Sequence, residues 1–195
     1  MNETLKNSSM ELITLSVARP FIEEWHYSNK VPTGKNIFIG WYSGGVLYAV
    51  ADYGIGVNAY QASFLSRVTG LNVLNNNMLE LKRLCRIEPR NDLLPLTAFI
   101  SRCHKLLKKD GYRHIVSFSD PMHGHDGGIY KASNFIHLGK TNAENHAIDK
   151  DGVIRHRRFY YRHAKRHNLS MAEARLALGL KLVKTEKKDR WFISI

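Results

Sequence analysis

RHIVSFSDPMHGHDGGIYKASNFIH (residues 113–137) is the stretch of the chain that decides the fold. Its apolar start, which includes Ile115 and Phe118, predicts a buried strand that delivers Ser119 and Asp120 to a turn rich in Pro, Gly and His. A short helix is expected after this turn. Open α/β sheets commonly build ligand sites from a carboxylate at the end of a strand. The stretch therefore predicts a central strand with a candidate site, and the structural alternative is an ordinary strand, turn and helix cap.

The segments before this strand alternate between strand and helix patterns. Residues 11–16 predict a first strand, and residues 17–30 have the apolar spacing of a helix. The β-rich runs NIFIGWYS (36–43) and VLYAVADYG (46–54) flank a two-residue Gly-Gly turn, which is a strong hairpin signal. An irregular insertion with a short helix is expected from there to the central strand.

The central strand and the central helix follow. Residues 78–87 predict a strand, with Arg83 interrupting an apolar face, so that this arginine needs a partner. That face is expected to consist of Leu79, Leu81, Cys85 and Ile87. Residues 94–112 repeat apolar side chains at helical spacing and end at a capping Gly111. Exposed amides at the start of such a helix attract phosphates.

The last third of the chain predicts shorter elements. Ser170 and Glu173 form a capping-box pattern before a short helix, and residues 181–195 are expected to close the chain as a hairpin. The order is strand, helix, hairpin, strand, helix, strand, helix, strand. We therefore expect one α/β domain over residues 1–195 with a mixed sheet, and residues 141–195 as a basic C-terminal extension.

Composition limits the class of protein. A hydrophobic share of 44% and a charged share of 24% are typical of a globular chain. No segment approaches the length of a membrane span, and the N-terminus lacks the pattern of a secretion signal, so we expect a cytoplasmic protein. Cys85 and Cys103 lack the short spacing of a zinc or redox pair and are expected to be reduced packing thiols.

The charge indicates a polyanionic partner. The chain has 29 Lys and Arg against 17 Asp and Glu, and residues 141–195 alone, with thirteen against six, contribute +7 of the net +12. Within IRHRRFYYRHAKRH (154–167), cations alternate with aromatic rings, which suits phosphates and unpaired bases. The alternative is a solvated basic helix face with its aromatic rings in the core. The nucleic-acid-binding candidates are Arg155, Arg157, Arg158, Tyr160, Arg162, Lys165 and Arg166.

The predicted element order resembles the Gcn5-related N-acyltransferase (GNAT) fold, in which a mixed sheet is splayed in the middle and an acyl donor lies in the gap. GNAT enzymes usually place a Gly-rich pyrophosphate loop before the central helix. The corresponding stretch here, RIEPRNDLLPLTAF (86–99), contains no glycine, which argues against ordinary coenzyme A binding.

A closer resemblance is carried by short motifs: HYS at 26–28, ELKRL at 80–84, PRN at 89–91, SFSDP at 117–121 and GHDGGIYKASNFIHLG at 124–139. Together they resemble the phage Mom family, over most of residues 20–140. That resemblance implies a GNAT-related enzyme that converts adenine in DNA to an N6-methylcarbamoyl (acetamido- or glycinamide-type) derivative. Such a modification protects phage DNA from restriction, and the protein would act in the bacterial host cell.

The resemblance also implies site residues. The catalytic candidates are His26, Tyr27, Ser119 and Asp120, and the donor-binding candidates are Arg83, Arg90, Asn91 and Thr97. Because the adenine amine is a weak nucleophile, a base has to take its proton, and Asp120 or His26 could do so. Tyr27 would donate a hydrogen bond or stack, Ser119 would orient Asp120 or the donor, and Glu80 would pair with Arg83. The remaining loop candidates are His123, His125, Tyr130 and Asn134.

Donor, metal and partner stay open. A coenzyme A thioester and glycyl-tRNA both suit a GNAT-like cleft. His123 and His125 are weak candidate ligands for iron, and the alternative is a polar substrate loop without metal. The paired adenine lies inside a duplex, so it would have to be flipped out of double-stranded DNA. The oligomeric state is open, with a homodimer as one alternative.

Three other functions compete with DNA adenine modification. They are a GNAT-type N-acyltransferase acting on a protein, an RNA or a small-molecule amine, a noncatalytic DNA-binding protein, and, more distantly, a methyltransferase that uses S-adenosylmethionine. The SDPM run only superficially resembles the motif of adenine N6 methylases.

Overall fold

The computed structural model describes residues 8–56, 61–87, 95–143, 145–155, 157–184 and 186–195. It divides the chain into two compact units, where the sequence led us to expect one domain. The first unit holds the chain up to Ser119 together with Asp126–Gly139 and Asp189–Ile195, and the second holds Asp120–His125 and Lys140–Lys188. The second unit therefore consists mainly of an insertion and not of a C-terminal extension.

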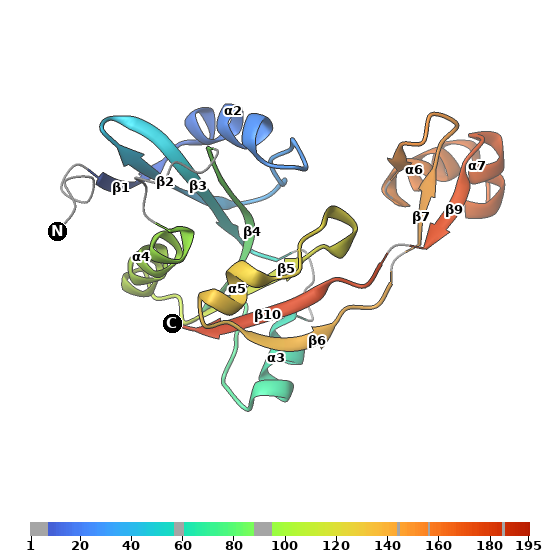
Figure 1. Cartoon of the computed structure of the whole chain (residues 1–195). Helices are drawn as coiled ribbons and strands as arrows, with labels where there is room; N and C mark the ends of the chain where they lie inside the picture. Colours follow the sequence, from blue (N-terminus) through green and yellow to red (C-terminus); the bar gives the residue numbers. More distant parts are fainter. Residues whose placement is uncertain (1–7, 57–60, 88–94, 144, 156, 185) are drawn as a thin grey trace. The chain divides into compact units, whose positions relative to one another are not determined.

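A mixed seven-stranded sheet forms the first unit (Figure 1). Its strand order is β1 (Ser8–Ile13), β2 (Asn36–Ser43), β3 (Val46–Gly54), β4 (Met78–Arg86), β5 (His114–Ser119), β10 (Asp189–Ser194) and β6 (Ile136–Lys140). The pairs β1–β2, β2–β3, β3–β4 and β5–β10 are antiparallel, whereas β4 and β5 run parallel. The predicted hairpin is confirmed, and its turn residues Gly44 and Gly45 have the positive φ angles, 57° and 80°, that a tight hairpin requires.

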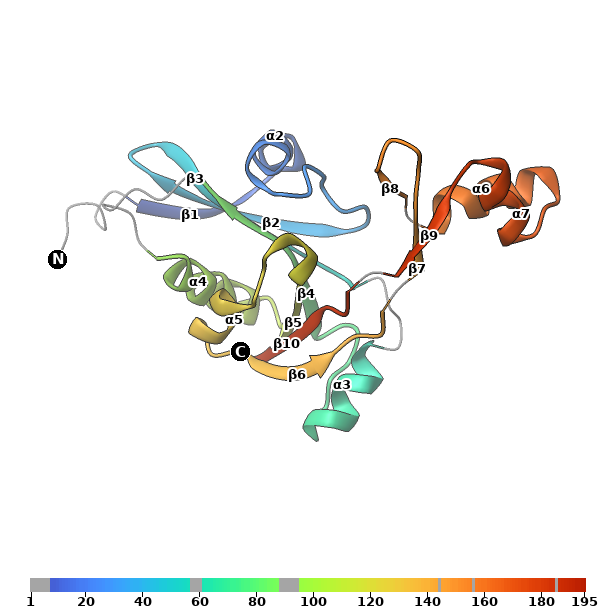
Figure 2. The ribbon, with the colours of Figure 1, turned by 45° about the vertical axis from the view of Figure 1, so that its right-hand side comes forward.

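Helices cover both faces of this sheet. α2 (Leu15–Trp25) and α3 (Gln61–Thr69) pack on one face, and α4 (Leu96–Lys109) and α5 (Gly128–Ala132) pack on the other (Figures 1 and 2). The central helix predicted from its apolar spacing is α4, which buries Phe99, Ile100, Cys103 and Leu107. Both cysteines are free and buried, as expected. Within the described residues, no helix combines the length and apolar character needed to cross a bilayer.

A β-bulge in β4 corrects one prediction from the sequence. Asp52 pairs with Arg83 and Tyr53 with Leu81, so Lys82 is an extra residue in β4. An extra residue reverses the alternation of faces, since side chains alternate with a period of two. Leu79 and Leu81 consequently pack with α4, whereas Cys85 packs with α2 on the opposite face. The prediction that these side chains share one face is wrong.

The sheet opens between β4 and β5. The two strands pair only from Met78 with His114 to Leu81 with Ser117. Beyond this point β4 continues along β3, whereas β5 continues along β10 and pairs Ser119 with Asp189. The splayed sheet expected from the GNAT resemblance is therefore present, and we call the point at Leu81 and Ser117 the fork.

The second unit has a sheet and a core of its own. Its strand order is β8 (Ile154–Arg155), β7 (Asn145–Ile148) and β9 (Lys181–Lys184), with α6 (Arg157–His167), α7 (Met171–Ala177) and the 3-10 turn η1 (Pro121–His123). Ala147, Tyr160 and Leu180 form the core. The predicted capping box of Ser170 and Glu173 is present at α7.

The predicted closing hairpin is wrong. β9 belongs to the small sheet of the second unit, whereas β10 is an inner strand of the main sheet. Sequence proximity favours pairing of neighbouring strands, but Trp191 and Phe192 of β10 are buried in the core of the first unit. The burial of these large rings explains why β10 pairs with β5.

Candidate functional site

A hydrogen-bonded pair of hydroxyls marks the fork. Ser117 Oγ lies 2.8 Å from the Leu81 carbonyl oxygen and 2.8 Å from the Tyr130 hydroxyl. The Leu81 carbonyl can only accept, so Ser117 Oγ donates to it, and the hydroxyls of Ser117 and Tyr130 are joined by a second hydrogen bond. Tyr130 of α5 is thereby fixed to the point where β4 and β5 part.

Charged and aromatic groups lie around Tyr130. Burial raises the pKa of Tyr130 above 10.0, and the hydrogen bond with Ser117 opposes this effect. Tyr27 and Glu80 also raise this pKa and Arg83 lowers it, so all three lie within electrostatic range of the phenol. Tyr130 is thus a neutral hydroxyl near pH 7.

Arg83 finds its partners in the backbone. Its Nε donates to the Lys30 carbonyl at 3.1 Å and its Nη1 donates to the Lys82 carbonyl at 2.6 Å. The sequence led us to expect a partner for this arginine. The Lys30 carbonyl lies in the loop after α2, so Arg83 holds this loop against β4.

His26 is held in one tautomer. The Ser28 backbone amide donates to His26 Nδ1 at 3.1 Å, and the Ser28 hydroxyl lies 2.9 Å from the same nitrogen. An amide can only donate, so Nδ1 accepts and the proton of the neutral ring resides on Nε2. His26 is buried and its ring contacts the half-exposed Tyr27 at a centroid distance of 4.3 Å. The sequence-predicted pair therefore consists of an imidazole with its proton on Nε2 and a neighbouring phenol.

Ser119 is positioned by a tryptophan. Trp191 Nε1 donates to Ser119 Oγ at 2.9 Å, and both residues are buried. The same indole stacks on Tyr130 with ring centroids 5.9 Å apart. Gly127 has a φ of 80° and approaches the indole so closely that a Cβ there would overlap it. Trp191 therefore ties the end of β5 to α5.

Asp120 is the first residue of the second unit. Its Oδ2 forms an ion pair with Lys188 Nζ at 2.9 Å, and the residue is 8% exposed. Its backbone carbonyl accepts hydrogen bonds from the amides of His123 and His125. The side chains of these two histidines are exposed.

The metal candidates do not form a ligand set. Among the described residues no three His, Cys, Asp or Glu side chains converge as a metal site would require. A two-histidine pattern alone is too few ligands for the mixed N/O site considered from the sequence.

Asp52 is a buried carboxyl that sequence reasoning did not identify. It is 0% exposed, and neither carboxylate oxygen has a hydrogen-bond partner among the described residues. Burial raises its pKa from 3.8 to about 7, although the positive charges of Lys82 and Arg83 lower it. Asp52 therefore changes charge near neutral pH beside the β4 bulge.

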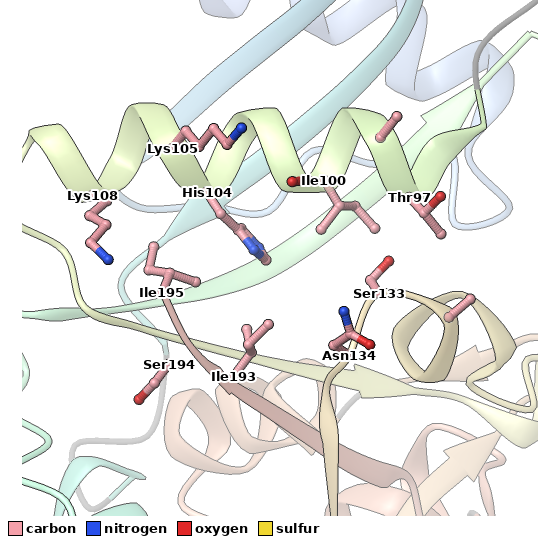
Figure 3. Close-up of a pocket in the computed structure, with 13 residues that line it drawn as sticks. Thr97, Ile100, His104, Lys105, Lys108, Ser133, Asn134, Ile193, Ser194 and Ile195 are labelled. Carbon is pink, nitrogen blue, oxygen red and sulfur yellow. The ribbon is translucent and has the colours of Figure 1, made fainter.

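A pocket of about 480 Å³ runs along α4 (Figure 3). Thr97, Ile100 and His104 line one wall, and Ser133 and Asn134 face them from the end of α5. His104 Nε2 and Ser133 Oγ are buried without a partner among the described residues. The pocket thus brings together two sequence-predicted residues, Thr97 and Asn134, and could hold a small polar ligand. The candidates Arg90 and Asn91 lie outside the described residues.

The basic candidates in the second unit divide into two groups. Tyr160 is 2% exposed and belongs to the core, so its ring is not available for stacking, contrary to the prediction from sequence. Arg155 is ion-paired with Asp149 at 2.7 Å and lies over the Phe159 ring. The exposed members are Arg157, Arg158, Arg162, Lys165 and Arg166, all on α6.

Comparison with known proteins identifies the family. The sequence matches the model of the Mom protein family over residues 7–192. The chain belongs to the Mom protein family. It is 27% identical over 146 residues to the methylcarbamoylase Mom of Escherichia phage Mu, which covers 74% of this chain and 58% of that protein. The match therefore spans less than two thirds of this Mom relative.

The fold of this Mom family member is that of GNAT N-acetyltransferases. The ribosomal-protein-S18-alanine N-acetyltransferase of Escherichia coli aligns with a TM-score of 0.54 at 10% identity, covering 96% of this chain and 94% of that one. A spermidine N-acetyltransferase SpeG mutant from Vibrio cholerae aligns with a TM-score of 0.53 at 7% identity, covering 97% and 94%. These likenesses show the fold alone and confirm the expected fold class.

The Mom motifs in this sequence point to some of these residues and miss others. HYS and the GHDGGIYKASNFIHLG run contain His26, Tyr27 and Tyr130; His26 contacts Tyr27, and Tyr27 lies within electrostatic range of Tyr130 at the fork. Ser117, Asp52 and Trp191 were not identified as site residues. The sequence did contain a signal for each of them. Ser117 is a polar residue within an apolar strand, Asp52 is a carboxylate within an apolar hairpin strand, and Trp191 lies in the last strand.

Proposed function

We propose that this protein is a transferase that modifies the N6 amine of adenine in DNA and adds a C2H3NO group of the methylcarbamoyl or glycinamide type. The observation that carries the proposal is the fork between β4 and β5, with Tyr130 and Ser117 fixed at its vertex in a chain of the Mom family. The GNAT-like fold is consistent with attack of an amine on an acyl carbon. The chain's net charge of +12 suits a polyanionic substrate.

The proposed chemistry uses neutral donors and one base. The adenine N6 lone pair attacks the carbonyl carbon of an ester or thioester, the N6–H bond breaks, and the leaving oxygen or sulfur departs with a proton. The Nε2–H of His26 and the hydroxyl of Tyr27 are suited to stabilise the developing oxyanion. Asp120, which directly follows the last residue of β5 in the chain, is the candidate base for the amine proton.

The donor follows from atom balance. Transfer of a glycyl group from an ester, as on tRNA, adds C2H3NO and releases the alcohol; the resulting N6-glycyl amide then rearranges, without gain or loss of atoms, to the isomeric glycinamide-type group. An acetyl thioester adds C2H2O and lacks the nitrogen. We therefore favour a glycyl ester as donor. Cells fed with labelled glycine should yield labelled modified adenine, and unlabelled modified adenine would contradict this choice of donor.

Mass spectrometry of nucleosides tests the function. DNA from cells expressing the wild-type protein should contain deoxyadenosine with the added C2H3NO, and fragmentation would separate the two isomers. Tyr130→Phe and Asp120→Ala should each lose most of the product. Tyr112→Phe removes a hydroxyl outside the site and serves as the matched control. Unmodified DNA from well-folded wild-type protein would overturn the proposal in favour of an acyltransferase acting on RNA, protein or a small amine.

A further inference from the structure

The second unit concentrates the positive charge of the chain. Residues 140–188 carry thirteen Lys and Arg against five Asp and Glu, a net +8 of the chain's +12. Their fold rests on a small apolar core of Ala147, Tyr160 and Leu180. α6 buries only Tyr160 and Ala164, so most of its side chains are left for solvent or a partner.

A groove of about 490 Å³ lies along α6. It is lined by Arg158, Phe159, Arg162, His163, Arg166 and Leu178, and none of these residues is acidic. The three arginines recur every four residues, which in an α-helix places them about 6 Å apart along one side. Such a row can contact successive phosphates of one strand, since guanidinium groups bind phosphate through paired hydrogen bonds.

The groove also has an apolar part. Phe159 is 48% exposed, and the Arg155 guanidinium lies 5.2 Å from its ring centroid. Arg155 is itself held by Asp149 at 2.7 Å, so one side of the Phe159 ring is supported by a fixed group. An exposed ring next to a row of cations is the arrangement on which single-stranded nucleic acids stack their bases.

We propose that this groove binds an unpaired stretch of the DNA strand that is modified, with Arg158, Arg162 and Arg166 on its phosphates and Phe159 against a base. The inference rests on the proposed function for the identity of the nucleic acid. A hollow of this size suits a nucleotide whose base is unpaired, because the face of a paired base is covered by its neighbours in the duplex. The groove along α6 then holds the substrate strand, whereas the reacting groups are those at the fork and Asp120, which directly follows β5 in the chain.

Fluorescence anisotropy of a labelled oligonucleotide with the full-length protein tests the groove. Single-stranded DNA should bind more tightly than the duplex or the RNA of the same sequence. Arg162→Gln should weaken binding of the single strand about fivefold at 0.1 M salt and lower the slope of log K against log salt by about 0.7, the value for one released phosphate contact. Phe159→Leu should weaken binding at least fivefold without changing this slope.

Arg157→Gln is the matched control, since it removes the same charge from the same helix at a residue that does not line the groove. It should change affinity less than Arg162→Gln does. Far-UV circular dichroism establishes that the variants fold. Equal affinity of Arg162→Gln, Phe159→Leu and Arg157→Gln would overturn the proposal, as would tighter groove-dependent binding of RNA or of the duplex.

The same proteins, assayed by nucleoside mass spectrometry, separate this inference from the proposed function. Groove-dependent binding of single-stranded DNA without any modified adenine would sustain the groove and refute the function. Modified adenine together with variants that bind like the wild type would sustain the function and refute the groove.

Discussion

Replacing Asp52 with Asn should change how the stability of the protein depends on pH. The carboxyl is 0% exposed and its pKa is raised from 3.8 to about 7 because burial disfavours its charged form. Between these two values the folded protein holds a proton that the unfolded chain has released, so stability falls as pH rises. Each pKa unit corresponds to 1.36 kcal/mol, and the ionised carboxylate therefore lowers the free energy of unfolding by about 4 kcal/mol above pH 7.

Urea unfolding of wild type and Asp52→Asn from about pH 4 to pH 8 measures this effect. The neutral amide introduces a constant difference at every pH, because it places unpaired donors in the same site. The informative quantity is the change of that difference with pH, which also cancels the titration of all other groups. It should shift by about 4 kcal/mol in favour of the variant on going from pH 4 to pH 8. A difference that is the same at both ends would refute the argument that Asp52 is protonated by burial.

Two further predictions concern the backbone at Gly127 and the loss of stability at low pH. Gly127→Ala should lower the free energy of unfolding by about 2–5 kcal/mol in urea, since φ is 80° and the added Cβ overlaps the Trp191 indole. Gly124→Ala, with φ 73° and open space around it, should cost only the backbone share of about 1–2 kcal/mol, and equal losses would contradict the overlap. Burial lowers the pKa of His104 from 6.5 to about 4, so between these two values only the unfolded chain binds this proton. Stability should therefore decrease by about 3 kcal/mol as the pH is lowered from 6.5 to 4. His104→Gln should remove that fall in an acid titration followed by circular dichroism, and an unchanged profile would argue against it.

Local signals in the sequence predicted much of the fold. The Gly-Gly turn, the apolar spacing of α4 and the Ser170 capping box each depend on residues close together in the chain, and each is present in the structure. The strand before Asp120 was predicted for the same reason. Short-range patterns of this kind determine turns, caps and amphipathic helices directly.

Features that depend on distant residues were not predicted. Nothing near Lys82 indicates that β4 bulges, because the bulge is set by pairing with Asp52 and Tyr53 across the sheet. The separation of β9 from β10 depends on burying Trp191 against Tyr130, which lies far away in sequence. The same contact makes Trp191 part of the site, and a lone Trp in a strand ordinarily indicates core packing alone.

The basic segment shows the limit of charge as a signal. Its composition indicated a polyanionic partner but could not separate Tyr160, which faces the core, from Phe159, which is half exposed. Once α6 is known to bury Tyr160 and Ala164, the positions opposite them follow from helical periodicity. The sequence did not show which face of α6 packs against the three-stranded sheet of the second unit.

The points where the chain enters and leaves the inserted segment are held together. The Thr141 amide donates to the Lys188 carbonyl at 2.8 Å, and the Lys188 amide donates to Thr141 Oγ1 at 3.1 Å. Insertions are best tolerated where the ends of the inserted segment meet at a fixed spacing, because the host fold then experiences no change in the length of its own strands. Residues between these two points can consequently be exchanged by design while the seven-stranded sheet keeps its register.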